Sequence, residues 1–418
     1  MSIPKPVVLV VALLLIAGTL LLVMPRTAVA DGTLPPATWY AVVWQQNTNS
    51  LHWINANGEQ ASIPRPRLQN EASATSGVRL HISPNGRYLV VMAPLLDGRE
   101  GIGFFDLQTG YFLQTHQTEP NEVFMWNGYY PSTISSTHFA VSLRNNTTTD
   151  WRIIAFELAS GNVVAQLTNS DPTLPGNMPL SADWWPVVAH YDLDEGLGQT
   201  RVRFQMVTYP NAPDTTFPSF MWYPETTAIG PDALPFSMNT GFDIMPASGQ
   251  VVYAWYDGNP PTPTATNTLS TQVAPNYAPV TVFVDGTAAP RYPRWLRGGQ
   301  WIGYRTETGP YQPHWVITTP NGQNSVPLSP EIGSLYATAD GFLAVDSINW
   351  RLMHMTTYPV EAFATSFGTT VFQGQPFTVI YTTPAEVGFS LPQVVEQQPN
   401  PGVNAAVGDA VQAPDQPV

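Results

Sequence analysis

The sequence predicts an all-β fold, a β-propeller of seven four-stranded blades, and three observations support this prediction. Glycine marks tight turns beside short apolar segments, at Gly58, Gly86, Gly110, Gly161, Gly249, Gly299, Gly322 and Gly341. The segments between these turns recur in units of about 40 residues, an interval typical of propeller blades. The first unit lacks one strand, which a segment near the end of the chain can supply.

The clearest unit is 78–117. Its apolar segments are separated by turn residues and lie at 78–82, 87–93, 101–107 and 111–116. Four antiparallel strands in about 40 residues form one blade. Comparable units lie at 39–63, 123–168, 182–226, 241–290, 291–329 and 333–367. In the unit 182–226, we expect 186–191 and 199–209 to be the two middle strands.

Closure of the ring depends on the unit 39–63, which shows only three strands, and on the segment 376–382. A ring that stays open exposes two strand edges to pairing with other chains. We therefore expect 376–382 to complete the first blade. Six or eight blades, or a pair of two-sheet β-sandwiches, are the alternatives, although sandwiches do not account for the repeated turns.

The unit 78–117 also carries a recognisable repeat. Ser83-Pro84-Asn85-Gly86 precedes its second strand, and Phe105-Asp106-Leu107-Gln108-Thr109-Gly110 ends its third. This pattern resembles the repeat of TolB-like (WD-type) β-propellers, with Asn85 in place of the usual aspartate. The resemblance implies a propeller over most of 39–382. It also implies an extracytoplasmic binding or scaffold role.

The N-terminal segment 1–30 has the order of an export signal. Lys5 precedes the apolar run 7–24, and Ala28-Val29-Ala30 fits a cleavage site. A signal peptide cleaved after Ala30 and an N-terminal membrane anchor formed by 7–24 are the two alternatives. Both place the rest of the chain outside the cytoplasm, either secreted or anchored.

The remaining boundaries follow from composition. We expect a linker at 31–38 and the propeller at 39–391. A disordered Pro/Thr-rich insertion at 257–279 and a disordered tail at 392–418 lie outside the packed core.

Composition excludes several classes of chemistry. The chain has no cysteine, so disulfides, thiolate nucleophiles and cysteine metal sites are absent. Its single lysine, Lys5, lies in the export segment, which excludes a Schiff-base or P-loop lysine. The net charge of −14 disfavours nucleic acid as a partner.

The sequence also lacks the common hydrolase motifs. Its scattered histidines lie in or beside apolar strands and are interpreted as structural, at His81, His138, His190, His314 and His354. No catalytic residue is assigned.

Acidic residues supply the candidate binding site. We expect connections between the second and third strands of the blades to form an acidic rim on one face, with Asp97, Glu100, Asp150, Asp192, Asp194, Glu195 and Asp257. Within it, Asp192, Asp194 and Glu195 form a weak candidate site for Ca²⁺, and no other cofactor is expected. The alternative is that these residues are solvated hairpin tips.

Aromatic residues give a second candidate surface. The chain has 13 tryptophans, and six of them either stack on sugar rings or fill the space between blades: Trp184, Trp185, Trp222, Trp295, Trp301 and Trp315.

The leading hypothesis is a non-enzymatic extracytoplasmic module that holds a protein partner of the cell envelope on one face. A carbohydrate-binding or carbohydrate-active propeller, with a glycan as ligand, is the first alternative. A sensor domain anchored by 7–24 is the second, and only this segment would contact the membrane.

Overall fold

The computed structural model describes residues 39–56, 60–125, 134–194, 199–208, 218–232, 242–244, 250–255, 268–272, 280–284, 290–306, 314–322, 325–356, 365–366, 375–382 and 405–406. The predicted export segment 1–30 and the linker 31–38 lie outside these residues and stay predictions. Among the helical elements of the described residues, none has the length and apolar character that crossing a membrane requires.

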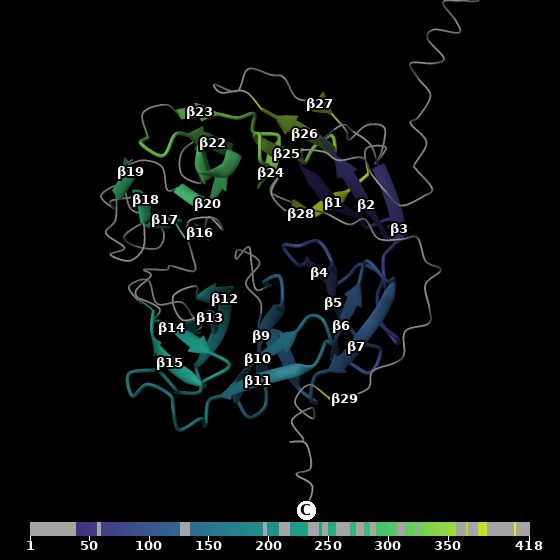
Figure 1. The fold of residues 1–418 in the computed structure, drawn as a ribbon, viewed down its shortest axis with the longest axis vertical. Coiled ribbons are helices and arrows are strands. Elements are labelled where there is room, and N and C mark those ends of the chain that lie inside the picture. Colours follow the sequence, from purple (N-terminus) through teal and green to yellow (C-terminus); the bar gives the residue numbers. More distant parts are fainter. Residues whose placement is uncertain are drawn as a thin grey trace, which may run out of the picture.

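The described strands form seven sheets arranged in a ring (Figure 1), and we call the four antiparallel strands of each sheet a blade, numbered 1–7. Blade 1 contains β28 (Phe377–Thr382), β1 (Tyr40–Gln45), β2 (Ser50–Asn55) and β3 (Gln60–Pro64). Blade 2 contains β4 (Arg79–Ile82), β5 (Tyr88–Pro94), β6 (Glu100–Asp106) and β7 (Tyr111–Gln117). Blade 3 contains β8 (Glu122–Met125), β9 (His138–Asn145), β10 (Trp151–Glu157) and β11 (Val163–Thr168).

The other four blades continue in chain order. Blade 4 contains β12 (Trp184–Asp194), β13 (Gln199–Thr208), β14 (Ser219–Tyr223) and β15 (Ala228–Pro231). Blade 5 contains β16 (Phe242–Ile244), β17 (Val251–Trp255), β18 (Thr268–Gln272) and β19 (Val280–Val284). Blade 6 contains β20 (Pro290–Leu296), β21 (Trp301–Thr306), β22 (His314–Thr318) and β23 (Ser325–Pro327). Blade 7 contains β24 (Ile332–Ala337), β25 (Phe342–Asp346), β26 (Arg351–Met355) and β27 (Thr365–Ser366).

Blade 1 is completed by the late strand, as predicted. β28 pairs antiparallel with β1, with Phe377 opposite Gln45 and Val379 opposite Val43. Figure 1 shows β28 toward the centre of the ring, where the labelled first strands β4, β12, β16, β20 and β24 also lie. Phe377 and Val379 are buried against a cluster shared by blades 7 and 1. The pairing therefore covers the inner edge of β1 and closes the ring.

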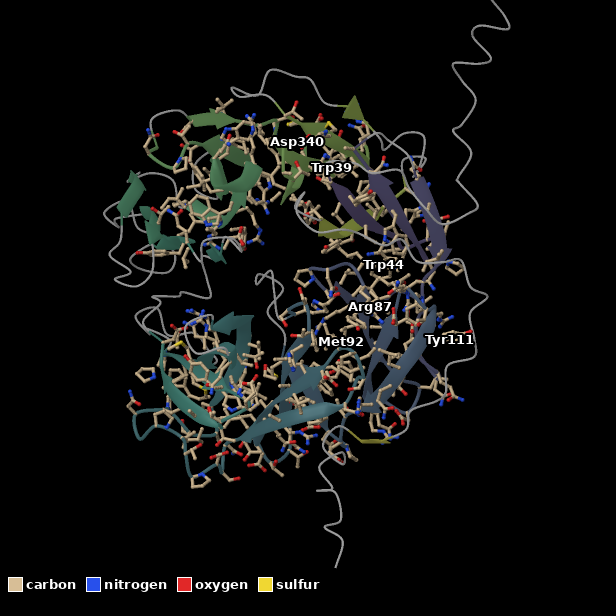
Figure 2. The ribbon with its side chains drawn as sticks, in the orientation of Figure 1. Trp39, Trp44, Arg87, Met92, Tyr111 and Asp340 are labelled. Atoms are coloured by element: carbon tan, nitrogen blue, oxygen red, sulfur yellow. The ribbon has the colours of Figure 1, made fainter. Side chains whose placement is uncertain are left out.

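A buried polar contact reinforces the closure between blades 7 and 1. The Nε1–H of Trp39 donates to His354 Nε2 at 3.1 Å, and Asp340 Oδ1 lies 3.0 Å from the same nitrogen. Trp39 precedes β1, while Asp340 and His354 belong to blade 7; Figure 2 shows Trp39 and Asp340 close together. This nitrogen accepts from the indole when it carries no proton and donates to the Asp340 carboxylate when it carries one, so the tautomer decides which of the two hydrogen bonds forms. This contact agrees with the structural role predicted for His354.

The TolB-like residues of blade 2 form its turns. Gly86 and Gly110 have φ angles of 71° and 79°, values that glycine adopts without strain. The Ser83 hydroxyl accepts a hydrogen bond from the Tyr88 amide at 2.9 Å. Asn85 accepts from the Arg87 amide at 3.1 Å, and its side-chain amide donates to Ser136 O of blade 3 at 3.2 Å. A carboxylate cannot make this second contact, which gives a physical reason for asparagine at this position.

Apolar side chains fill the space between neighbouring blades. Between blades 2 and 3, the ring of Phe104 lies 5.0 Å from that of Phe156 and 6.4 Å from that of Phe139, centroid to centroid. All three rings are fully buried. The core is thus a series of wedges between sheets, which explains why both faces of the middle strands are apolar.

Two predicted disordered segments contain strands. Thr268–Gln272, inside the predicted insertion 257–279, is β18 and pairs with β17. Leu269 and Thr271 are buried, so an alternating pattern within this Pro/Thr-rich segment places it in the sheet. In the predicted tail 392–418, Ala405–Ala406 forms β29, which pairs parallel with β7. The rest of the tail lies outside the described residues.

We expect Phe377→Ala to lower the free energy of unfolding by about 3–5 kcal/mol, because it removes a buried ring from the closing strand. Thr378→Ala is the matched control, since Thr378 lies next in the same strand and is exposed. Chemical denaturation of both variants measures the difference. Equal stability of the two would contradict the role assigned to β28.

His81 on β4 makes stability depend on pH. Burial, and secondarily Arg79, lowers the pKa of His81 to about 3, below the usual value of 6.5. Between about pH 3 and pH 6.5, the His81 side chain binds a proton more readily in the unfolded chain than in the folded protein. The free energy of unfolding is therefore unaffected by this group above about pH 6.5 and decreases as the pH falls below that value. We expect wild-type protein to lose at most about 1.4 kcal/mol per pH unit more than His81→Phe in this window. Denaturation at pH 7, 5 and 4 checks this, and parallel pH profiles would contradict it.

Candidate binding face

The strand order defines two faces of the ring. Strands within each blade are antiparallel, and the last strand of one blade leads into the first strand of the next. Connections between second and third strands therefore emerge on the same face as the crossovers between blades. We call this the crossover face. Connections between first and second strands, and between third and fourth strands, emerge on the opposite face.

On the crossover face, second-to-third turns are tied to the crossovers that enter their blades. Backbone hydrogen bonds run from Leu96 N to Asn70 O (2.8 Å), from Asn146 N to Asn121 O (2.9 Å) and from Ser347 N to Glu331 O (2.9 Å). These contacts belong to blades 2, 3 and 7. The same backbone contact thus fixes turns on three separate blades, so these turns have little freedom to lose on binding.

The crossover from blade 1 to blade 2 is held by a buried ion pair. The Arg65 guanidinium contacts both carboxylate oxygens of Glu71, and neither side chain is exposed. Arg65 also donates to Pro66 O at 3.0 Å, Ala74 O at 2.9 Å and Asn49 Oδ1 at 2.6 Å. These bonds satisfy the buried charge. They fix the segment whose Asn70 carbonyl holds the Leu96 turn.

Two of the predicted acids of blade 2 have different surroundings. Asp97 is exposed at the second-to-third turn and binds Arg99, whose hydrogen bonds lower the pKa of the Asp97 carboxyl. Glu100 is the first residue of β6 and accepts a hydrogen bond from the Phe124 amide at 2.6 Å. Burial raises the pKa of Glu100, and the Phe124 bond and Arg79 oppose that rise. Asp97 therefore faces the solvent, whereas Glu100 serves as an internal acceptor.

Asp150 lies on the crossover face in blade 3. Its carboxylate accepts a hydrogen bond from the Asn169 side chain at 3.0 Å. This bond, and one from Thr148, lower the pKa of Asp150. Asp257 falls in the connection between β17 and β18, outside the described residues.

The Asp192 loop does not belong to this face. β12 is the first strand of blade 4, and Asp192 and Asp194 are near its end, so the connection 195–198 joins first and second strands. β12 ends and β13 begins at the opposite face, so the prediction that Asp192 and Asp194 belong to a single acidic rim with Asp97 and Asp150 is wrong. Residues 186–191, which lie within β12, were predicted from the sequence to form a middle strand. No local sequence pattern indicates which strand of a blade is the first.

Glu195 lies outside the described residues. Within the described part, no group of three His, Asp or Glu side chains is placed to hold a metal ion. A Ca²⁺ site at this loop stays a prediction.

Three of the five exposed large apolar side chains of the described residues lie on connections of the crossover face, each at a different blade. Among the described residues, large apolar side chains are exposed at Leu96 (73%), Ile348 (66%), Val164 (48%), Leu180 (45%) and Tyr111 (44%). Leu96 and Ile348 are in second-to-third turns, and Leu180 is in the crossover to blade 4. Val164 and Tyr111 lie on the fourth strands of their blades, and Figure 2 shows Tyr111 at the periphery. Sequence reasoning missed these residues, although Leu96-Asp97-Gly98 places an apolar residue in a turn signal.

The Ile348 turn is held rigidly. Asp346 Oδ1 accepts hydrogen bonds from the backbone amides of Ile348 (3.0 Å) and Asn349 (2.9 Å). Its other oxygen binds Arg351 Nη2 at 2.7 Å. The exposed Ile348 side chain is thus presented by a fixed turn.

The tryptophans considered for sugar stacking belong mostly to the core. Trp222, Trp295, Trp301 and Trp315 are at most 5% exposed. Trp184 and Trp185 are partly buried against the core between blades 3 and 4, and the Arg144 guanidinium lies 4.5 Å from the Trp185 ring centroid. These side chains fill space between blades, the second of the two roles predicted for them.

Among known proteins, only solved structures show similarity to this chain. No model of a known protein family and no curated protein sequence matches the chain.

Three solved structures illustrate the likeness, each at 10% identity. TolB from Acinetobacter baumannii has a TM-score of 0.38, with 70% of this chain and 63% of that one covered. The Dos1 propeller has a TM-score of 0.49, with 88% and 100% covered. The periplasmic gluconolactonase PpgL from Pseudomonas aeruginosa has a TM-score of 0.42, with 85% and 99% covered. The β-propeller architecture itself follows from the strand order of the described residues.

We expect Glu71→Gln to lower the free energy of unfolding by about 3–5 kcal/mol, because it leaves the Arg65 charge buried without its counter-charge. Arg67→Gln is the control: Arg67 lies 3.6 Å from Glu71 but its side chain is 46% exposed, so we expect a loss below about 1 kcal/mol. Denaturant titration compares the two variants. A Glu71→Gln protein as stable as Arg67→Gln would contradict this account.

Proposed function

We propose that the protein is a non-enzymatic binding module whose crossover face holds a protein partner outside the cytoplasm. The observation that carries the proposal is the placement of Leu96, Leu180 and Ile348. Three of the five exposed large apolar side chains of the described residues lie on connections of this one face. A contiguous apolar area is typical of an interaction surface, and these three side chains are the apolar positions that a partner covering several blades of this face would bury.

The backbone contacts of this face support binding. The turns of Leu96 and Ile348 are fixed by hydrogen bonds to neighbouring crossovers. A surface that is ordered before binding loses little conformational entropy in the complex. About 800 Å² per partner is usual for a stable interface, an area that extends over several turns.

Charge favours a basic partner. Asp150 is exposed on this face, and hydrogen bonds lower the pKa of its carboxyl, so it stays ionised at neutral pH. Asp97 is ionised on the same face as well, in an ion pair with Arg99. Exposed rim charges contribute mainly to the association rate and to partner choice. The export pattern of 1–30 supports a location outside the cytoplasm. Burial of four of the six tryptophans considered for sugar stacking removes the main support for a carbohydrate ligand.

We expect Leu96→Glu and Ile348→Glu each to weaken partner capture at least tenfold, because each places a charge in an apolar contact. The experiment is affinity capture from solubilised cell envelope, quantified by mass spectrometry, followed by titration with the purified partner. Val164→Glu is the matched control, since Val164 is exposed on the outer strand β11 and away from the crossover face.

The proposed binding face would be contradicted if Val164→Glu weakened capture of the partner as much as Leu96→Glu and Ile348→Glu. It would also be contradicted if both of these crossover-face variants still captured the partner. A parallel capture in EDTA tests the Ca²⁺ prediction. Loss of the partner in EDTA that Ca²⁺ restores would support a metal at the Asp192 loop, and unchanged capture would count against it.

A further inference from the structure

Positive charge in this acidic chain concentrates on the inner half of blade 6. Residues 290–306, which form β20, the 3₁₀ turn η1 (Arg297–Gly299) and β21, contain four arginines and no acidic residue. The whole chain has 16 Lys and Arg against 30 Asp and Glu. This short segment thus has the opposite sign of charge from the protein as a whole.

Two of these arginines are directly opposite each other. Arg291 on β20 is the register partner of Arg305 on β21, and both are partly buried. Residues that are direct partners in an antiparallel ladder project from the same side of the sheet, about 4.5–5.5 Å apart at Cβ. β20 begins and β21 ends on the crossover face, so the pair lies at that end of the blade.

A β-bulge brings a third arginine to the same side. The register shifts between Arg291 and Arg294, so Arg294 pairs with Gly303. Without the extra residue, Arg291 and Arg294 would project from opposite sides, because side chains alternate along a strand. Gly303 and Arg305 are two residues apart on β21, so they face the same side of the sheet. Arg294, the partner of Gly303, therefore projects from the same side as Arg291 and Arg305.

The bulge carries backbone strain. Tyr292 has a φ angle of 51°, in the left-handed region that a bulky residue rarely adopts. Strained backbone of this kind is typical of binding sites and persists only where the surrounding structure holds it. Here the strained residue is the one that aligns the three arginines.

The neighbouring strands define the surroundings of this site. On the same side of blade 6, Leu296 and Ile317 pack against Leu335 of blade 7. The Trp295 amide, next to Arg294 in the strand, donates to Oδ2 of Asp243 in blade 5 at 2.8 Å. The arginines therefore lie at the crossover-face end of the packing between blades 6 and 7.

We propose that Arg291, Arg294 and Arg305 form a binding site for a small oxyanion, a carboxylate or phosphate group. Guanidinium groups bind such groups through paired N–H donors in a fixed geometry. Like charges directly opposite each other in a sheet are unfavourable, and an oxyanion between them removes that repulsion. The site lies on the same face as the proposed protein contact, but its anion binding does not depend on a protein partner.

The experiment measures thermal unfolding and calorimetric binding with inorganic phosphate and with citrate, each against sodium chloride at equal ionic strength. Low millimolar anion keeps the general stabilisation by kosmotropic salts small. We expect at least one anion to raise the Tm of the wild-type protein with the logarithm of its concentration. Phosphate alone would identify a phosphate site, and citrate alone a carboxylate site.

Arg305→Gln should bind that anion at least tenfold more weakly, and in chloride it should be at least as stable as wild type. Arg305→Lys should show intermediate affinity, because lysine keeps the charge but not the paired donors. Arg99→Gln is the control, since Arg99 binds the exposed Asp97 at 2.5 Å far from blade 6. Equal binding by wild type and Arg305→Gln, or no effect of either anion on wild type, would overturn the proposal.

Discussion

The antiparallel pairing of β28 with β1 is the interaction on which the rest of the structure depends. It joins segments from the two ends of the propeller and completes the sheet against which blades 7 and 2 pack. Its influence reaches further round the ring, because the Tyr381 hydroxyl of β28 donates to Pro84 O in the first turn of blade 2. Asn85 of that turn then bonds to blade 3. Three consecutive blades are thus linked by the closing strand and one turn.

A closed ring explains how the crossover face is held. Each blade contributes its own turns, and the relative positions of turns on different blades are set by the wedges of side chains between the sheets. The crossovers then fix individual turns by backbone hydrogen bonds. The face is therefore a rigid support built from the packing of the ring.

Local chemistry made much of the fold predictable. Glycine turns, the Ser83 and Asp106 motifs and the incomplete first unit depend on residues close in sequence, and the turns and the closing strand are as predicted. The position of Asp192 was not predictable, because it depends on strand order within a blade. The exposure of Leu96 was not predictable, because 43% of the chain is hydrophobic and one more apolar residue does not stand out. The alignment of Arg291 with Arg305 depends on register, and no sequence pattern indicates the bulge.

Closure by the last strand also has a consequence for folding kinetics. The contact between Trp39 and His354 spans 315 residues, and β28 lies later still. Contacts of such sequence separation form slowly, because the chain must close a long loop before they are gained. The ring therefore cannot form until nearly the whole chain is available. Until β28 has been synthesised, the inner edge of β1 stays without its partner and the ring stays open.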